Sequence, residues 1–258
     1  MSEAPAVRLA AAIHELVRTH TAAAPPPRGL AYLGLEHTSG TGFHLLDALA
    51  ARGIFRKYEL VLDVGAGLGA SSRWLAGRLG CVAVGTTSAA EARAGRELTR
   101  RAGLAAQVRF VPADAQALPF RVAHFTHVWI LEALPRMADP EAALHEAFRV
   151  LRRGGSVAVQ DLVLAEAGAD PCVPGWRPDT AAARREALAR AGFTDLEVRD
   201  RTPEAAEHSA QIVAAREQLA RRLRTDPALA PMAAEREALA RALGTGTLRV
   251  VQLLGRRP

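Results

Sequence analysis

A short apolar run, three glycines and a helical stretch follow one another between residues 60 and 79. Residues 60–64 (LVLDV) have the length and composition of a buried strand, and residues 70–79 suit a helix. Glycines between them permit a tight turn and let a ligand approach the backbone without meeting a Cβ atom. The N–H groups at the start of the helix suit an anionic group such as a phosphate or a carboxylate. This unit therefore predicts an α/β sheet with a ligand site at its turn.

The same alternation continues through the rest of the chain. Strands are expected at 60–64, 81–85, 107–111, 124–131, 156–164, 194–198 and 248–254. Helices are expected at 5–20, 43–52, 70–79, 89–102, 140–152 and 180–191. Strands that alternate with helices predict a doubly wound, mostly parallel sheet covered by helices on both faces.

Two segments fall outside this rhythm and give a domain hypothesis. Residues 1–28 hold an N-terminal helix and a proline-rich linker, and residues 203–243 form a helical insertion before the last strand. The ligand-binding domain then comprises 29–202 and 244–258. The insertion is expected to be a lid or an oligomer contact, which leaves a homodimer possible.

Composition narrows the class of protein. With 258 residues, 49% hydrophobic and 23% charged, the chain can bury a sizeable core. Its two cysteines rule out a disulfide scaffold or a zinc site of the CxxC type. The net charge is +6, and Lys57 is the only lysine among 33 basic residues. Arginines spread along helical stretches indicate solvated helix faces, and an Arg-rich nucleic-acid-binding surface is kept as an alternative.

The sequence also bears on location. No run approaches the ~20 apolar residues of a membrane span. The N-terminal residues include an acid and lack the basic start of a secretory signal. We therefore expect a cytoplasmic protein without membrane contact.

The glycine turn alone fits two classes of ligand. Gly65, Gly67 and Ala70 satisfy the G-x-G-x-x-A form of a dinucleotide site. Asp63, two residues before the first glycine, argues against it, because a carboxylate disfavours a pyrophosphate and suits a ligand with an ammonium group. The second strand ends at Thr86-Thr87 without an acid to bind a ribose, which counts against NAD. An NAD(P)-binding oxidoreductase stays as the alternative.

Four motifs in order carry a family resemblance. The segment 63–69 (DVGAGLG) resembles the first motif of the class I S-adenosylmethionine (SAM) dependent methyltransferases, and 108–120 is similar to their D-A-x-x-L-P-F segment. Residues 128–155 resemble the fourth-strand region and the glycine turn of the small-molecule branch, which includes ubiquinone-biosynthesis and sarcosine/dimethylglycine enzymes. Residues 191–193 (AGF) look like the turn before the sixth strand. The resemblance covers about 37–200 and implies a seven-stranded Rossmann-like fold.

The resemblance implies how SAM is held. The glycines would cradle its methionine part, Asp63 would hold the amino group directly or through water, and Asp114 would bind the adenine amine. A turn-forming role is the alternative for Asp114. The full expected cofactor set is Asp63, Gly65, Ala66, Gly67, Gly69, Thr86, Thr87, Asp114, Ala115 and Trp129. Thr86 stands where the family usually has a ribose-binding acid.

The resemblance further implies transfer of a methyl group from SAM to N, O or C of a small-molecule acceptor. In-line displacement needs alignment, and a base only for some acceptors. His37 and Glu132 are the catalytic candidates. The substrate-binding candidates are Tyr32, His37, Glu132, Arg136 and Trp176. No metal is expected. The D-P-P-Y type of signature of amino-methylating nucleic-acid enzymes is absent, so a nucleic-acid substrate is disfavoured. A SAM-binding fold with chemistry other than methyl transfer is a further alternative.

Overall fold

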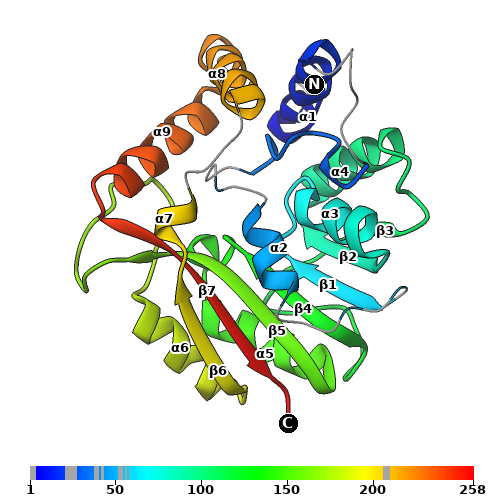
Figure 1. The fold of residues 1–258 in the computed structure, drawn as a ribbon, viewed down its shortest axis with the longest axis vertical. Helices are drawn as coiled ribbons and strands as arrows, with labels where there is room; N and C mark the ends of the chain where they lie inside the picture. Colours follow the sequence, from blue (N-terminus) through cyan, green and yellow to red (C-terminus); the bar gives the residue numbers. More distant parts are fainter. Residues whose placement is uncertain are drawn as a thin grey trace.

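The computed structural model describes residues 4–20, 28–37, 41, 44–51, 55, 57, 59–205 and 210–258. The strands are β1 (Leu60–Val64), β2 (Val82–Thr87), β3 (Val108–Pro112), β4 (Phe125–Leu131), β5 (Leu151–Leu164), β6 (Thr194–Asp200) and β7 (Leu248–Arg256). The helices are α1 (Pro5–His20), α2 (His44–Ala50), α3 (Ala70–Leu79), α4 (Ala89–Arg101), α5 (Pro140–Val150), α6 (Ala181–Arg190), α7 (Thr202–Ala205), α8 (Ala210–Thr225) and α9 (Ala230–Gly244). Short 3-10 helices occur at Arg28–Leu30 and Leu134–Arg136. Figure 1 shows their arrangement.

The strands form one seven-stranded sheet in the order β3-β2-β1-β4-β5-β7-β6. All pairs are parallel except those of β7, which runs antiparallel to both β5 and β6. The predicted seven-stranded, mostly parallel α/β sheet is thus confirmed. The strand order reverses beside β1, between β2 and β4. In open α/β sheets, ligands bind outside the carboxyl ends of the strands at such a switch point.

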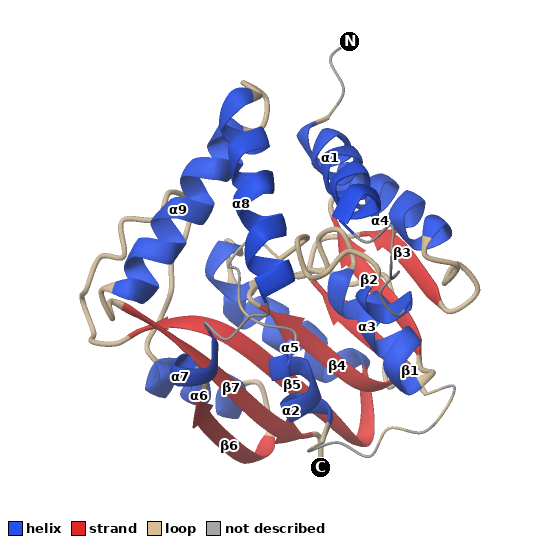
Figure 2. Ribbon diagram, turned by 45° about the horizontal axis from the view of Figure 1, so that its top comes forward, coloured by secondary structure: helices blue, strands red, loops and turns tan. Residues whose placement is uncertain are grey.

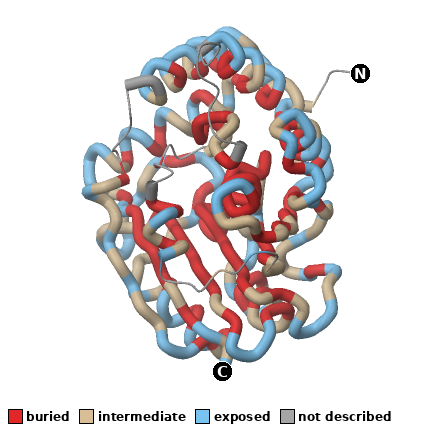
Figure 3. The backbone as a smooth tube through the Cα atoms, turned by 45° about the vertical axis from the view of Figure 1, so that its right-hand side comes forward, coloured by how far each residue is buried: buried red, intermediate tan, exposed pale blue. Residues whose placement is uncertain are grey.

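Helices cover both faces of this sheet. Leu144, Ala147 and Leu188 of α5 and α6 pack with buried strand residues on one face. Leu49, Trp74 and other buried residues of α2 to α4 pack on the opposite face. Figure 3 shows the buried residues gathered along the strands, with exposed residues on the outer helices. Burial on both faces explains why the strands were recognisable as continuous apolar runs.

The boundary between α5 and β5 differs from the prediction. The helix was expected to continue to about Arg152, but it ends at Val150, and β5 begins at once at Leu151. Gly154 and Gly155 pair with Arg257, the residue directly after β7. The Gly154 N–H donates to the Arg257 carbonyl at 2.7 Å, and the Arg257 N–H donates to the Gly155 carbonyl at 3.0 Å. A Cβ on Gly155 would lie 2.8 Å from the carbonyl oxygen of Thr126, so this close approach requires glycine. The glycine pair therefore belongs to an extended strand and does not terminate the helix.

The N-terminal helix and the long helices between β6 and β7 lie together. Helices α1, α8 and α9 occupy the end of the molecule away from the C-terminus (Figures 1 and 2). Buried residues of all three share one apolar cluster, including Ile13, Leu219 and Ala233. In the parts of the chain described here, no helix has the length and apolar character needed to cross a membrane.

Candidate functional site

The glycine turn follows the carboxyl end of β1, and two of its glycines adopt left-handed backbone conformations. Gly65 and Gly67 have φ of +73° and +53°. A Cβ on Gly65 would approach the Cβ of Ala133 to 2.5 Å, so the turn lies directly against the end of β4. A Cβ on Gly67 would meet nothing within 4 Å and would project into open space. The turn therefore presents bare backbone to a ligand on the Gly67 side.

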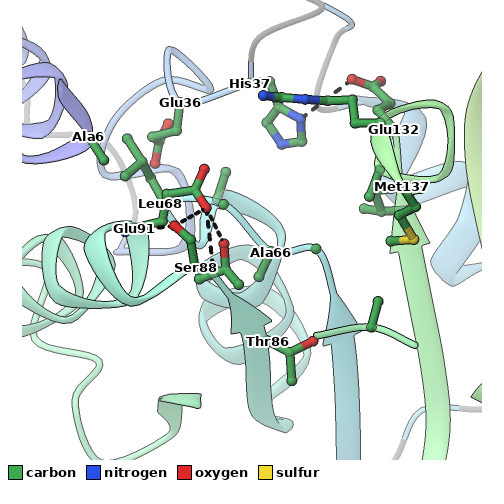
Figure 4. Close-up of a pocket in the computed structure, with 18 of the residues that line it drawn as sticks. Ala6, Glu36, His37, Ala66, Leu68, Thr86, Ser88, Glu91, Glu132 and Met137 are labelled. Atoms are coloured by element: carbon green, nitrogen blue, oxygen red, sulfur yellow. Dashed lines mark hydrogen bonds and ion pairs between the residues drawn. The ribbon is translucent and has the colours of Figure 1, made fainter. Parts of the chain in front are cut away.

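A cavity of about 510 Å³ opens above this turn (Figure 4). Its wall comprises Ala6, Leu9, Glu36, His37, 65–68, Ala70, Ser71, 86–88, Glu91, 113–116, 131–133, 136–138, Trp176, Met232, Glu235 and Arg236. It thus extends from the tip of β2, over the turn, to helices α1 and α9. Most of the expected site residues are brought together here: Gly65, Ala66, Gly67, Thr86, Thr87, Asp114, Ala115, His37, Glu132, Arg136 and Trp176.

A carboxylate that the sequence analysis did not identify lies beside the tip of β2. The hydroxyl groups of Thr87 and Ser88 donate to Oε2 of Glu91, at 2.6 and 2.7 Å. Ser88 is the N-cap of α4, and Glu91 closes a capping box with it. The S-x-x-E spacing was visible in the sequence, but it did not show that the carboxylate would lie near the strand tip. The start of α4 therefore places a carboxylate in the cavity wall that also includes Thr86.

Thr86 offers a polar atom to a ligand. Its side chain is buried, and its Oγ1 has no hydrogen-bond partner among the described residues. Buried hydroxyl groups are normally bonded. Since Thr86 lines the cavity, an unsatisfied hydroxyl fits a bound molecule with hydroxyl groups of its own, such as a ribose.

Asp114 forms a turn and also lines the cavity. It lines the cavity, and its Oδ1 accepts a hydrogen bond from the backbone N–H of Gln116 at 2.9 Å. This is the turn-forming bond of an Asx residue. The second carboxylate oxygen contacts the Gln116 side chain at 3.4 Å. The turn therefore orients an exposed carboxylate at the cavity wall, and its oxygens can accept further hydrogen bonds.

Glu132 lies at the end of β4 in a strained conformation. Its φ is +57°, which is uncommon for a residue with a side chain and occurs often at functional sites. The buried carboxylate accepts hydrogen bonds from the hydroxyl of Thr41 and from Nε2 of Gln160, the latter at 2.9 Å. His37 Nδ1 is 4.0 Å from Glu132 Oε2 (Figure 4). A carboxylate and an imidazole therefore face the cavity as a pair that can accept or relay a proton.

Two glutamine side chains support Glu132 through consecutive hydrogen bonds. Gln252 of β7 donates to Oε1 of Gln160 at 2.9 Å and to the carbonyl of Leu45 at 2.8 Å. These bonds fix the Gln160 side chain so that its Nε2 faces Glu132. The network links β4, β5, β7 and α2, and it gives Glu132 one preferred orientation.

Four expected residues do not reach the cavity. The Asp63 carboxylate is buried behind the turn and accepts hydrogen bonds from Ser71 and Ser72, both at 2.6 Å. The Tyr32 hydroxyl donates to the carbonyl of Leu98 at 3.0 Å. Trp129 stacks on Trp74 within the core, with ring centroids 6.0 Å apart.

The fourth of these residues, Gly69, is the N-cap of α3 and packs against Phe110. Its place at the helix start explains its glycine, since its φ is +85°. The structure thus separates residues that shape the turn from those that face a ligand.

Helix α9 supplies wall residues that no motif indicated. Met232, Glu235 and Arg236 come from the insertion and line the cavity. Glu235 accepts a hydrogen bond from the indole N–H of Trp176 at 2.8 Å and lies 3.5 Å from Arg136. Trp176 and Arg136, both expected at a substrate site, are therefore joined to α9 through one carboxylate. Only the packing of the insertion could reveal this.

Within the described residues, no group of three or more His, Cys, Asp or Glu side chains is arranged to hold a metal ion. The expectation of a metal-free site stays a prediction.

Comparisons with known proteins agree on one family. Residues 62–159 match the family described as "Methyltransferase domain". The chain is 37% identical over 105 residues to methyltransferase GfsG of Streptomyces halstedii, covering 40% of this chain and 38% of that protein. It is 36% identical over 107 residues to sarcosine/dimethylglycine N-methyltransferase of Halorhodospira halochloris, covering 41% and 38%. The aligned segment thus spans well under half the length of these curated relatives.

A solved structure extends the likeness beyond that segment. The crystal structure of the [4+2]-cyclase SpnF superposes with a TM-score of 0.72 and 26% identity, covering 83% of this chain and 80% of that one. The likeness therefore includes elements outside the matched segment 62–159.

Proposed function

We propose that this chain, a class I SAM-dependent methyltransferase by its fold and its methyltransferase domain, transfers a methyl group from SAM to N, O or C of a small-molecule acceptor. The observation that carries the proposal is the cavity above the glycine turn, where bare backbone, an unsatisfied Thr86 hydroxyl and the Glu91 and Asp114 carboxylates meet. These groups fit a sulfonium nucleoside amino acid. The match of residues 62–159 to a methyltransferase domain favours this ligand over a dinucleotide.

Different residues of the cavity would bind different parts of the cofactor. Gly65 and Gly67 would receive the amino-acid part, Thr86 and Glu91 the ribose, and Asp114 the adenine amine. When bound, SAM supplies an electrophilic methyl group whose leaving group is neutral. The chain's own task is therefore to align the acceptor and exclude water.

Glu132 and His37 are proposed as the proton-accepting pair. The strained, buried Glu132 carboxylate is held by Thr41 and Gln160 and faces the cavity beside the imidazole. It would take a proton from a hydroxyl or an activated carbon acceptor as the methyl bond forms. An amine acceptor that is already neutral would need only positioning.

Binding of S-adenosylhomocysteine (SAH), measured by calorimetry, tests the proposal. The variant Gly67→Val places a branched side chain in the cavity at a left-handed position, and we expect SAH binding to fall at least about 100-fold, since both access and backbone geometry are lost. Gly168→Val is the matched control, because Gly168 also has positive φ (+81°) and open surroundings but lies outside the cavity wall.

Three results would contradict the proposal. They are no SAH binding to the unmodified chain, equal loss in both glycine variants, or thermal stabilisation by NADPH and not by SAH. The last would favour the oxidoreductase alternative.

One alternative within the fold has its own support. The solved structure of SpnF is named a [4+2]-cyclase and not a methyltransferase. If the chain binds SAH tightly but transfers no radiolabel from methyl-labelled SAM to any small molecule, chemistry without methyl transfer becomes the better proposal.

The wider setting also stays a proposal. A cytoplasmic location is carried forward from the sequence as a prediction. A homodimer, and no nucleic-acid partner, are carried forward from the sequence as predictions.

A further inference from the structure

Arg236 of α9 is a partly buried cation at the wall of the cavity. One of its terminal nitrogens donates to the carbonyl of Leu35 at 2.9 Å. Its Nε is buried and has no hydrogen-bond partner among the described residues. Since Arg236 also lines the cavity, part of its guanidinium group is available to a molecule bound there.

The nearby carboxylates bind other groups directly and act on Arg236 only through their charge. Glu36 binds the guanidinium of Arg73 through Oε1 at 2.6 Å, while its buried Oε2 has no hydrogen-bond partner among the described residues, and Glu235 is shared by Arg136 and Trp176. None of the ion pairs between described residues includes Arg236. The cation therefore lacks a full counter-charge within the described part of the chain.

A second arginine makes the surroundings more positive. Burial, and then the charge of Arg216 on α8, lower the pKa of Arg236 to about 10. Burial lowers the pKa of Arg216 to about 10 as well, against the opposing charge of Glu132. Both groups stay protonated at neutral pH, so two cations from the insertion lie near one another. Buried cations are costly unless an anion compensates them.

Apolar side chains also line the cavity near Arg236. Met232 lies one helical turn earlier on the same face of α9, and Leu9 of α1 lines the same cavity. A molecule bound here would meet hydrocarbon on its body and a guanidinium at one end. Guanidinium groups bind carboxylates and phosphates through paired hydrogen bonds.

We propose that the methyl acceptor is an organic anion whose carboxylate or phosphate group binds Arg236, while its apolar part lies against Met232 and Leu9. This inference rests on the proposed function. The cofactor's own carboxylate is the other possible source of the anion. We assign the acceptor because Arg236 comes from the insertion, outside the matched segment that holds the glycine turn.

The test uses three probes of equal chain length: hexanoate, hexyl phosphate and 1-hexanol. Thermal shifts are measured at one ionic strength, with and without saturating SAH, on the unmodified chain and on Arg236→Gln, Arg236→Lys and Arg241→Gln. Arg241 is the matched control, since it is exposed on the same helix and outside the cavity wall. SAH affinity of each variant is measured by calorimetry.

We expect at least one anionic probe to raise Tm more than hexanol does. Arg236→Gln should weaken anion binding at least about tenfold, Arg236→Lys should keep part of it, and Arg241→Gln should match the unmodified chain. SAH affinity should change less than threefold. Without anions, Tm of Arg236→Gln should equal or exceed that of the unmodified chain, because an uncompensated buried cation is removed.

Three results would overturn the inference. Hexanol could stabilise as well as the anions, or Arg236→Gln could keep the anion response. A loss of SAH affinity in Arg236→Gln would instead assign the arginine to the cofactor's carboxylate. If the unmodified chain fails to bind SAH at all, the proposed function fails, whereas the anion measurements without SAH still decide the role of Arg236.

Discussion

At the scale of single residues, Asp63 shows how a motif residue can act from behind the site. Its carboxylate holds the hydroxyls of Ser71 and Ser72 in the first turn of α3 and does not line the cavity. Burial raises its pKa, and the two serine bonds oppose that rise. The residue thus fixes the position of the helix start, whose N–H groups and preceding glycines form the ligand-facing surface.

Asp63→Ala should therefore lower stability and SAH affinity together. Loss of the acceptor leaves two buried hydroxyls unpaired, which costs about 2–4 kcal/mol in unfolding free energy, measured by urea titration. A Ser71→Ala/Ser72→Ala double variant should weaken SAH binding as Asp63→Ala does, because the anchoring is lost from the other side. Weaker SAH binding in Asp63→Asn with unchanged stability and a normal double variant would instead support direct contact with the ammonium group.

Glu132→Gln should separate catalysis from cofactor binding. The amide keeps the size of the side chain and removes the proton acceptor, so turnover of a hydroxyl or carbon acceptor should fall about 10²- to 10⁴-fold while SAH affinity stays unchanged. Steady-state kinetics and calorimetry measure the two effects. Glu237→Gln, on the exposed side of α9, is the control. Equal turnover in both variants would remove Glu132 from the proton-accepting role.

At the scale of helices and strands, the sequence was informative wherever a local pattern determined the element. β1 and α3 were predicted with their observed bounds because an apolar run, glycines and a helical stretch are all local signals. The cavity wall was harder to predict. Glu36 and Arg236 reach it through a loop and the packing of the insertion, which no motif spacing indicates. Glu91 reaches it through a capping box whose S-x-x-E spacing is local, but that spacing alone does not say that the carboxylate faces a cavity.

A buried ion pair joins two elements on the face away from α3. Asp161 of β5 and Arg184 of α6 lie 3.0 Å apart, and both side chains are fully buried. A buried acid inside a strand needs a partner for its charge, and this arginine is that partner.

Breaking this ion pair from either side should destabilise the fold. Asp161→Leu or Arg184→Met alone should cost about 3–5 kcal/mol, since each leaves one buried charge, whereas the double variant should be within about 1 kcal/mol of the unmodified chain. Chemical denaturation of the four proteins gives this double-mutant cycle. Additive losses in the double variant would mean that the two residues act independently.

At the scale of the whole molecule, the reactivity of the two cysteine thiols distinguishes the folded from the unfolded protein. Cys81 is buried beside β2, and burial raises the pKa of its thiol to about 11, so it stays protonated and unreactive at pH 8. The folded state disfavours the Cys81 thiolate. The stability that the protonated thiol contributes to the fold is therefore lost as the pH rises from about 9 towards 11. Cys172 is exposed.

A thiol reagent at pH 8 should therefore modify Cys172 rapidly and Cys81 only on unfolding. Cys172→Ser should abolish the fast phase, and added urea should release the slow thiol together with the loss of helical circular dichroism. Two fast thiols in the native protein would contradict the buried position of Cys81.

The sheet order has a consequence for how the protein is made. Among the described strands, β6 pairs with β7 alone, and β7 follows every other strand of the sheet in the chain. Gln252, which supports Glu132 through Gln160, is also on β7. The glycine turn lies in a part of the chain that is synthesised long before β7, whereas Gln160 gains its bond from Gln252 only once β7 lies between β5 and β6. A polypeptide that ends before residue 248 would therefore keep the glycine turn but leave Gln160, and through it Glu132, without this support.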